Sequence, residues 1–240
     1  MDTVFPYILT GHVAAGFASL LLFFIPMFAR KGGKLHSQVG KWYTYTMWAV
    51  VVSAILLCII RFYQGHYVMA LFLSFLALLT SRPLYYAIAI LKHKQARSVK
   101  LLRTDFILRL ALSIYSPILI GFGLGLWGPG GHALLTVFGT IGAVTSIPSI
   151  IQDLRGHKTD YNWLADHISG MIVSAIAAFT AFFSFGGRNI FGDAFDGNLV
   201  VFVWLAPTFI GVAIAQYHKR KLKLKKKADV GPGLVFTTPN

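Results

Sequence analysis

Residues 5–29 read FPYILTGHVAAGFASLLLFFIPMFA, a run without a single Lys, Arg, Asp or Glu. A helix needs about 20 mainly apolar residues to cross the ~30 Å hydrocarbon core of a bilayer, so this stretch is long enough to span one. No basic residue precedes it, and it exceeds the ~7–15 apolar residues of a signal peptide. Both features favour a permanent spanning helix.

Six further apolar runs of similar length follow. They cover residues 42–60, 67–91, 106–127, 133–152, 162–185 and 198–217. Because lipid offers backbone amides no hydrogen-bond partner, each run is predicted to be an α-helix. The expected fold class is all-α, a polytopic transmembrane bundle of about seven spanning helices in residues 1–217, followed by a basic tail in residues 218–240.

The composition agrees with a lipid environment. Hydrophobic residues make up 56% of the chain and charged residues 12%, whereas about 25% of an average soluble domain is charged. The net charge of +14 does not indicate a nucleic-acid partner, because the basic residues lie between apolar runs and are not interleaved with aromatic stacking platforms. Cys58 is the single cysteine, which excludes an intramolecular disulfide and a multi-thiolate metal site.

Lys and Arg fall on alternate connections between the apolar runs. They concentrate in residues 30–41, 92–104 and 153–161 and in the tail from His218, whereas the opposite connections contain only Arg61 and Arg188. Because positively charged loops stay on the cytoplasmic side, we expect the N-terminus outside and the C-terminus in the cytoplasm. The lipid bilayer is the expected partner, with anionic lipid headgroups at the Lys-rich tail.

Few ionisable side chains fall inside predicted spans, and three of them stand out. Arg82 lies in the run 67–91, His12 in the first run, and His167 near the start of the run 162–185. A charge in hydrocarbon is costly unless it is paired or faces a cavity, so each is a candidate functional residue. Arg82 is the strongest candidate, whereas a neutral imidazole bonded to a neighbouring helix is an equal alternative for His12.

Most of the polar residues map toward the predicted cytoplasmic half, where we expect one buried polar site. Its candidate members are His36, Arg82, Asp105, Arg109, Asp153, Asp166 and His167. Asp105 and Arg109 are spaced i, i+4, which by itself predicts a surface salt bridge. His12, with His66 and His132, forms a thinner group toward the outer ends of the helices.

Haem and zinc are the candidate cofactors. A zinc site of His36, His167 and one Asp is chemically reasonable, and a bis-histidine haem needs two histidines from facing helices at matching depth. His12 and His167 are expected near opposite surfaces, so His66 or His132 would be the partner of His12, and His36 the partner of His167. The absence of Glu excludes an HExxH metalloprotease and the usual ligands of di-iron bundles.

Several strings resemble a known family. They are Gly11-His12, KGGKLH at 31–36, GKWY at 40–43, His167-Ile168 with Met171, TAF at 180–182 and WLAPT at 204–208. They resemble a family of bacterial multi-pass membrane proteins known only as a domain of unknown function. The resemblance implies a protein of the bacterial cell (inner) membrane and draws attention to His12, His36, Arg82 and His167. The chain departs from the family at Gly170, where relatives have Arg.

Three functions remain open at this point. The first is a polar site in which Arg82 and His167, assisted by His36, bind a metal, a haem or an anionic group. The second is a transporter or channel, which requires a continuous polar path from His12 toward His167. The third is a non-catalytic partner or assembly protein that uses the exposed tail and small-residue helix faces. The sequence contains no catalytic motif, and enzymatic activity is left open.

Overall fold

The computed structural model describes residues 3–127, 131–156, 161–186 and 199–230, and within these ranges the chain is helical without any strand. Its elements are α1 (Val4–Phe28), α2 (Lys34–Tyr63), α3 (Tyr67–Ala89), η1 (Ile90–Lys92), α4 (Val99–Gly123), α5 (Ala133–Leu154), α6 (Trp163–Ala181), η2 (Phe182–Gly186) and α8 (Leu199–Val230). The predicted all-α class is confirmed.

Six of the described helices, α1 to α6, are long and apolar enough to cross a membrane. The chain is therefore described as a multi-pass membrane protein. The predicted seventh run is also helical, because α8 begins at Leu199, but α8 is not among these six, and a count of seven spans stays a prediction. α8 runs without interruption past position 217, so the basic tail continues the last helix as far as Val230. The Gly-Pro-Gly sequence at 128–130, which is typical of a tight turn, lies outside the described residues.

Two helices begin earlier than their apolar runs. α2 starts at Lys34 and α4 at Val99, whereas the apolar runs start at residues 42 and 106. At α4 the reason is local, because the Ser98 hydroxyl accepts a hydrogen bond from the Leu101 amide and caps the helix start. Apolarity marks only the part of a helix that suits lipid, and the capping residue marks where the helix begins.

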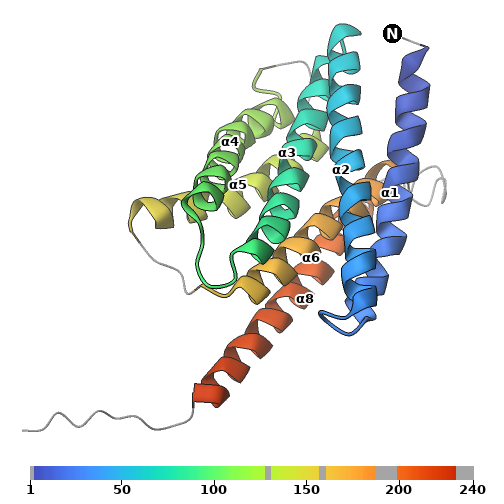
Figure 1. Ribbon diagram of the computed structural model, residues 1–240. Helices are drawn as coiled ribbons and strands as arrows, with labels where there is room; N and C mark the ends of the chain where they lie inside the picture. Colours follow the sequence, from blue (N-terminus) through green and yellow to red (C-terminus); the bar gives the residue numbers. More distant parts are fainter. Residues whose placement is uncertain (1–2, 128–130, 157–160, 187–198, 231–240) are drawn as a thin grey trace, which may run out of the picture.

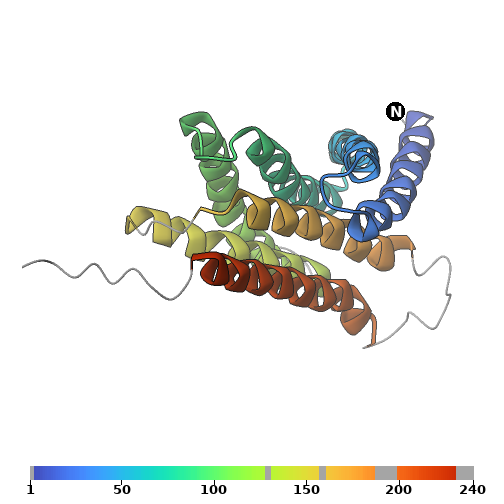
Figure 2. The same cartoon turned by 60° about the horizontal axis from the view of Figure 1, so that its bottom comes forward.

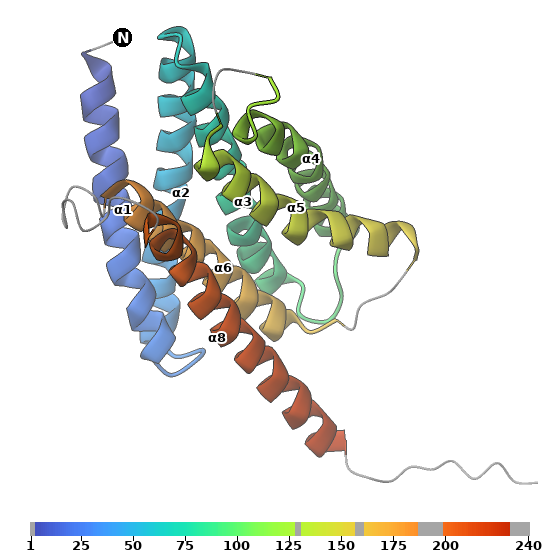
Figure 3. The same cartoon turned by 180° about the vertical axis from the view of Figure 1, so that it is seen from behind.

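The helices form a layered bundle around α6. Helices α1, α2 and α3 stand side by side (Figure 1), and α6 lies between this row and α8 (Figure 2). Seen from behind, α8 crosses the outer face of α6 (Figure 3). Helices α4 and α5 pack against each other and, through α4, join the row at α3. α3 therefore contacts α2 and α4 as well as α6.

Three of the four predicted basic segments gather at one end of the bundle (Figure 1), and the fourth, 153–161, lies partly outside the described residues. Residues 30–33, residues 93–98 and the C-terminal end of α8 lie at this end, and the start of α1 and the 64–66 turn lie at the other (Figure 1). We call the end with residues 30–33 and 93–98 the basic end. This grouping is the one that the alternation of Lys and Arg predicts for loops that share a side of a membrane.

Close contact between α3 and α6 depends on Gly170. A Cβ at this position would lie 2.7 Å from the Ala87 Cβ and 2.9 Å from the Pro83 carbonyl oxygen. Both distances are shorter than real Cβ contacts, and the Pro83 oxygen belongs to the backbone. Small residues allow transmembrane helices to approach this closely, and the resulting van der Waals contact is what holds them together in lipid.

We expect Gly170→Ala to lower the free energy of unfolding by about 1–3 kcal/mol, because the added methyl group forces α6 away from α3. Thermal unfolding in detergent measures the change. Gly40→Ala is the matched control, since nothing lies within 4 Å of its added Cβ and a helical Ala is favoured over Gly. Equal stability of the two variants would contradict the close-packing role of Gly170.

Candidate functional site

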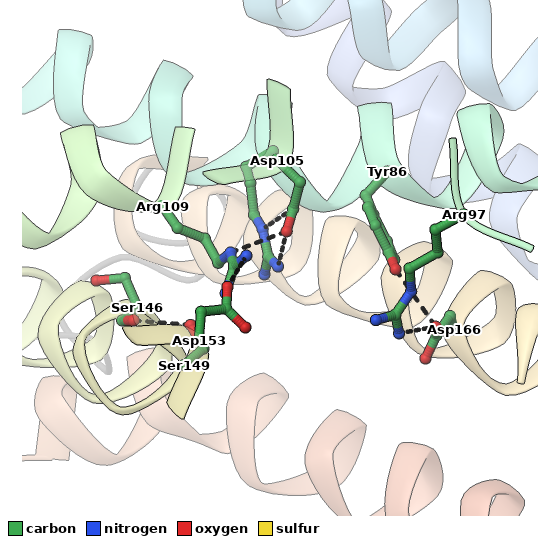
Figure 4. Close-up of polar contacts among 9 residues, drawn as sticks. Tyr86, Arg97, Asp105, Arg109, Ser146, Ser149, Asp153 and Asp166 are labelled. Atoms are coloured by element: carbon green, nitrogen blue, oxygen red, sulfur yellow. Dashed lines mark hydrogen bonds and ion pairs between the residues drawn. The ribbon is translucent and has the colours of Figure 1, made fainter. Parts of the chain in front are cut away.

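An ionic chain of four side chains joins α3, α4 and α5. The Arg82 Nε donates to Asp105 Oδ1 at 2.8 Å, and Asp105 Oδ2 lies 2.8 Å from the Arg109 Nε. The Arg109 Nη2 then donates to Asp153 Oδ2 at 2.6 Å. Figure 4 shows Asp105, Arg109 and Asp153 in this order. The predicted i, i+4 pair is present, but it is buried rather than on the surface, since Asp105 is 4% and Arg109 is 7% exposed.

The ionic chain is electrically balanced, because two guanidinium groups alternate with two carboxylates. A buried ion pair gives little net stability, but removal of one partner leaves an uncompensated charge and is strongly destabilising. The arrangement therefore positions three helices relative to one another. An anionic ligand at Arg82 would have to compete with Asp105, which already occupies two of the guanidinium nitrogens.

A second polar cluster connects the 93–98 loop with the start of α6. The Arg97 Nη2 donates to Asp166 Oδ2 at 3.1 Å, and the Tyr86 hydroxyl lies 3.4 Å from the same oxygen (Figure 4). The Arg97 guanidinium also covers the Tyr161 ring, 5.1 Å from its centre, and the Tyr161 hydroxyl donates to the His93 carbonyl. Asp166 thus belongs to this cluster, whereas its neighbour in the sequence, His167, bonds the Ala87 carbonyl oxygen.

His36 and His167 are held in the same way. The Nδ1 atom of His36 lies 3.0 Å from the Pro26 carbonyl oxygen, and Nδ1 of His167 lies 2.8 Å from the Ala87 carbonyl oxygen. A carbonyl can only accept, so in both rings Nδ1 carries the proton. In the neutral ring the lone pair is then on Nε2, which is the arrangement found in histidines that ligate metals.

Cations surround these two histidines at the basic end. His36 and Lys31 both lie close enough to His167 to interact with it electrostatically, and Lys31 also interacts with His218 of α8. Lys31 donates to the carbonyl oxygens of Pro26 (2.9 Å) and Met27 (2.8 Å), which fixes it at the end of α1. Burial, followed by the charges of Lys31 and Lys221, lowers the pKa of the His218 imidazole. We call Lys31, His36, His167 and His218 the basic-end cluster.

An apolar layer separates the basic-end cluster from His12. Three helices run through this layer, and each passes the same three levels in order from the basic end. On α2 the levels are marked by His36, Tyr43 and Val50. On α3 they are marked by Ala87, Leu84 and Ala77, and on α6 by His167, Ser174 and Ala178. The middle members of this order form a buried cluster of Tyr43, Met47 and Leu84, whose exposed fractions are 1%, 0% and 0%. The Tyr43 hydroxyl bonds Ser174 at 2.8 Å across this layer. His12 lies beyond it, beside Val50 and Ala77.

The structure distributes the predicted site residues over four places instead of one pocket. Arg82, Asp105, Arg109 and Asp153 form the ionic chain, Asp166 belongs to the Arg97 cluster, His36 and His167 belong to the basic-end cluster, and His12 lies apart. Arg82 and His167 have different hydrogen-bond partners, but the Arg82 guanidinium also lies 5.8 Å from the centre of the Tyr86 ring, so the ionic chain borders the Arg97 cluster. A single site in which Arg82 and His167 act together stays a prediction. His66 and His132 are exposed residues at the starts of α3 and α5.

Sequence reasoning missed the residues that complete each cluster. Arg97 and Lys31 counted only as loop charges, and Tyr86, Tyr161 and Ser53 gave no signal of their own. A usable signal for Arg97 was Asp166 in the first turn of α6, which needs a cation from a neighbouring basic loop. Ser53 and Tyr86 carry no such signal, because uncharged hydroxyls in long apolar helices are common.

Among the described residues, no three His, Cys, Asp or Glu side chains come together in a group that could hold a metal ion. His36 and His167 are therefore two imidazole donors without a third ligand of these types in metal-binding position, and His218, the third histidine of the basic-end cluster, does not complete such a group. Comparison of the chain with protein-family models, with curated proteins and with solved structures finds no match. Membership in the family that the sequence motifs resemble therefore stays a prediction.

We expect Asp105→Asn to destabilise the protein by about 3–5 kcal/mol, because it leaves Arg82 and Arg109 facing each other without the shared carboxylate. Thermal or denaturant unfolding in detergent measures the loss. Asp153→Asn serves as the control, since the Asp153 side chain is 44% exposed and its partner Arg109 keeps Asp105 as a counterion. A loss at Asp105 no larger than at Asp153 would mean that the ionic chain does not hold the three helices.

Proposed function

We propose that the chain is a multi-pass protein of the bacterial inner membrane that binds haem through His36 and His167, at its basic end and on the cytoplasmic side. The observation that carries this proposal is the shared anchoring of the two imidazoles. Each donates Nδ1–H to a fixed backbone carbonyl and keeps Nε2 for a ligand, and the charges of the two side chains are within electrostatic range of each other.

The number of donors favours haem over zinc. A zinc site in a protein takes three or four protein ligands, whereas a haem iron already has four porphyrin nitrogens and needs at most two axial ligands. Of the three histidines in the basic-end cluster, His36 and His167 are the two proposed ligands, and in the described part of the chain no third His, Cys, Asp or Glu completes a metal-binding group with them. When bound, haem would supply one-electron chemistry, and this chain would supply the axial nitrogens and their orientation.

The charge around the two histidines also suits haem. A free divalent cation would be repelled by Lys31, whose ammonium interacts with His167. The propionate groups of haem are anionic, and Lys31 and His218 are the cationic or protonatable groups placed to meet them. Neither has a carboxylate partner among the described ion pairs, because Asp105, Asp153 and Asp166 are all committed to arginines.

Transport receives less support than binding. A transporter would need a polar route between His12 and His167, and the buried layer of Tyr43, Met47 and Leu84 lies between them. A hydrophobic plug of this kind excludes water and ions from the path in this conformation.

We expect the detergent-purified protein to bind added hemin with a Soret band and a six-coordinate, low-spin spectrum. His36→Ala and His167→Ala should each convert it to a five-coordinate form with at least tenfold weaker binding, and the double variant should not bind. Absorption and electron paramagnetic resonance spectra measure this. His66→Ala, at the exposed start of α3, is the matched control and should match the unaltered protein.

An unchanged spectrum in both His36→Ala and His167→Ala would overturn haem ligation at this site. The same cations favour a second candidate, an anionic ligand such as a phosphate, bound without any metal. In that case Lys31→Ala would weaken phosphate binding measured by calorimetry, and hemin would give no ligand-dependent band at all.

The orientation in this proposal rests on the distribution of Lys and Arg, which supports a cytoplasmic basic end, an N-terminus outside and seven spans. We expect a reporter fused after residue 240 to be active only in the cytoplasm, and one inserted between α4 and α5 to be active only outside. The Lys-rich tail is proposed to contact anionic lipid headgroups. Two reporters in the same compartment would contradict this topology.

A further inference from the structure

His12 is fixed in one tautomer by its contact with α2. Its Nδ1 lies 2.8 Å from the Ser53 hydroxyl oxygen, and the Ser53 hydroxyl is itself 2.6 Å from the Ala49 carbonyl oxygen. Ser53 has one proton and donates it to that backbone carbonyl, so it must accept from His12 Nδ1–H. The Val50 carbonyl, which also lies within reach of the Ser53 hydroxyl, interacts with the imidazole as well. The lone pair of neutral His12 is therefore on Nε2.

His12 lines a cavity between α1, α2, α3 and α6. Its interior is about 80 Å³, and with the open space at its mouth it reaches about 540 Å³. A single water needs only ~10–15 Å³ measured in this way, so the interior has room for several ligand atoms. The lining residues are His12, Met47, Val50, Val51, Ala54, Leu73, Leu76, Ala77, Thr80, Ala177, Ala178 and Ala181. His12 and Thr80 are the polar side chains among them.

The walls keep this space open because they are built from small residues. Three alanines of α6, Ala177, Ala178 and Ala181, face His12 across the cavity, and Ala54 and Ala77 contribute from α2 and α3. On α1 itself, Gly16 lies one turn from His12, and a Cβ there would meet nothing within 4 Å. An apolar cavity with one hydrogen-bond acceptor selects a ligand that is mostly apolar and carries one donor.

We infer that this cavity binds the hydroxyl-bearing end of a lipid-soluble ring compound of the phenol or quinol class, with the hydroxyl donating to His12 Nε2. His12 lies eight residues into α1, about 12 Å along the helix axis from its start, which places it within the apolar part of a predicted span. The ring packs against the alanines of α6, and Thr80 is the second polar side chain available to it. This inference does not depend on haem binding at the basic-end cluster.

The test uses phenol and toluene, which have nearly the same size and differ by a hydroxyl in place of a methyl group. Protein labelled with ¹⁵N-histidine is placed in lipid nanodiscs, and the His12 imidazole signals are assigned by their loss in His12→Gln. We expect an unprotonated Nε2 in the free protein. We further expect a saturable shift of the Nε2 signal with phenol and at least a tenfold weaker response to toluene.

Ala177→Leu fills the cavity without removing His12 and should abolish the phenol response. Ala14→Leu, on an exposed position of the same helix as His12, is its control and should leave the response intact. A proton on Nε2 of the free protein, equal responses to phenol and toluene, or an unchanged phenol response in Ala177→Leu would each overturn the inference. Unfolding curves of both variants distinguish loss of the cavity from loss of the fold.

Discussion

Asp105 is the carboxylate on which the placement of α3, α4 and α5 depends, because the guanidinium groups of Arg82 and Arg109 converge on it inside the bundle. Hydrocarbon does not solvate charge, so each buried cation must find an anion within the protein. A chain with no Glu and few Asp has few ways to do this. Arg109 extends the same chain to Asp153, and the charge requirement thereby links three helices that apolar contact alone would orient loosely.

The same requirement separates the histidines from the ionic chain. Because the described aspartates at the basic end are bound to arginines, His36 and His167 turn to backbone carbonyls of α1 and α3. Their free nitrogens and the nearby Lys31 then form a site that is rich in donors and poor in carboxylates. His12 lies beyond the layer of Tyr43, Met47 and Leu84, where its Nδ1 bonds Ser53 and its ring lines a cavity with Thr80 and apolar side chains. Two chemically different environments thus lie on opposite sides of one apolar layer.

The features that the sequence predicted best are those that depend on local composition. All seven apolar runs correspond to helices, and the need of Arg82 for a buried partner was evident from its place in an apolar run. The i, i+4 spacing predicted the contact between Asp105 and Arg109 but not its burial, since spacing along one helix does not tell which face meets a neighbour. Asp153 and Arg97 find partners 44 and 69 positions away, and no local pattern specifies such pairs.

The sequence by itself determined that the chain is a bundle of membrane-spanning helices with basic connections at one end, because the length and polarity of a segment decide how it partitions between lipid and water. Tertiary structure alone decided that the predicted polar site is divided among separate clusters, and that Nε2 is the free nitrogen of His12, His36 and His167. Those outcomes depend on which carbonyls and hydroxyls of other helices lie beside each ring. Helix rotation and close approach at residues such as Gly170 set that proximity, and neither can be read from one helix at a time.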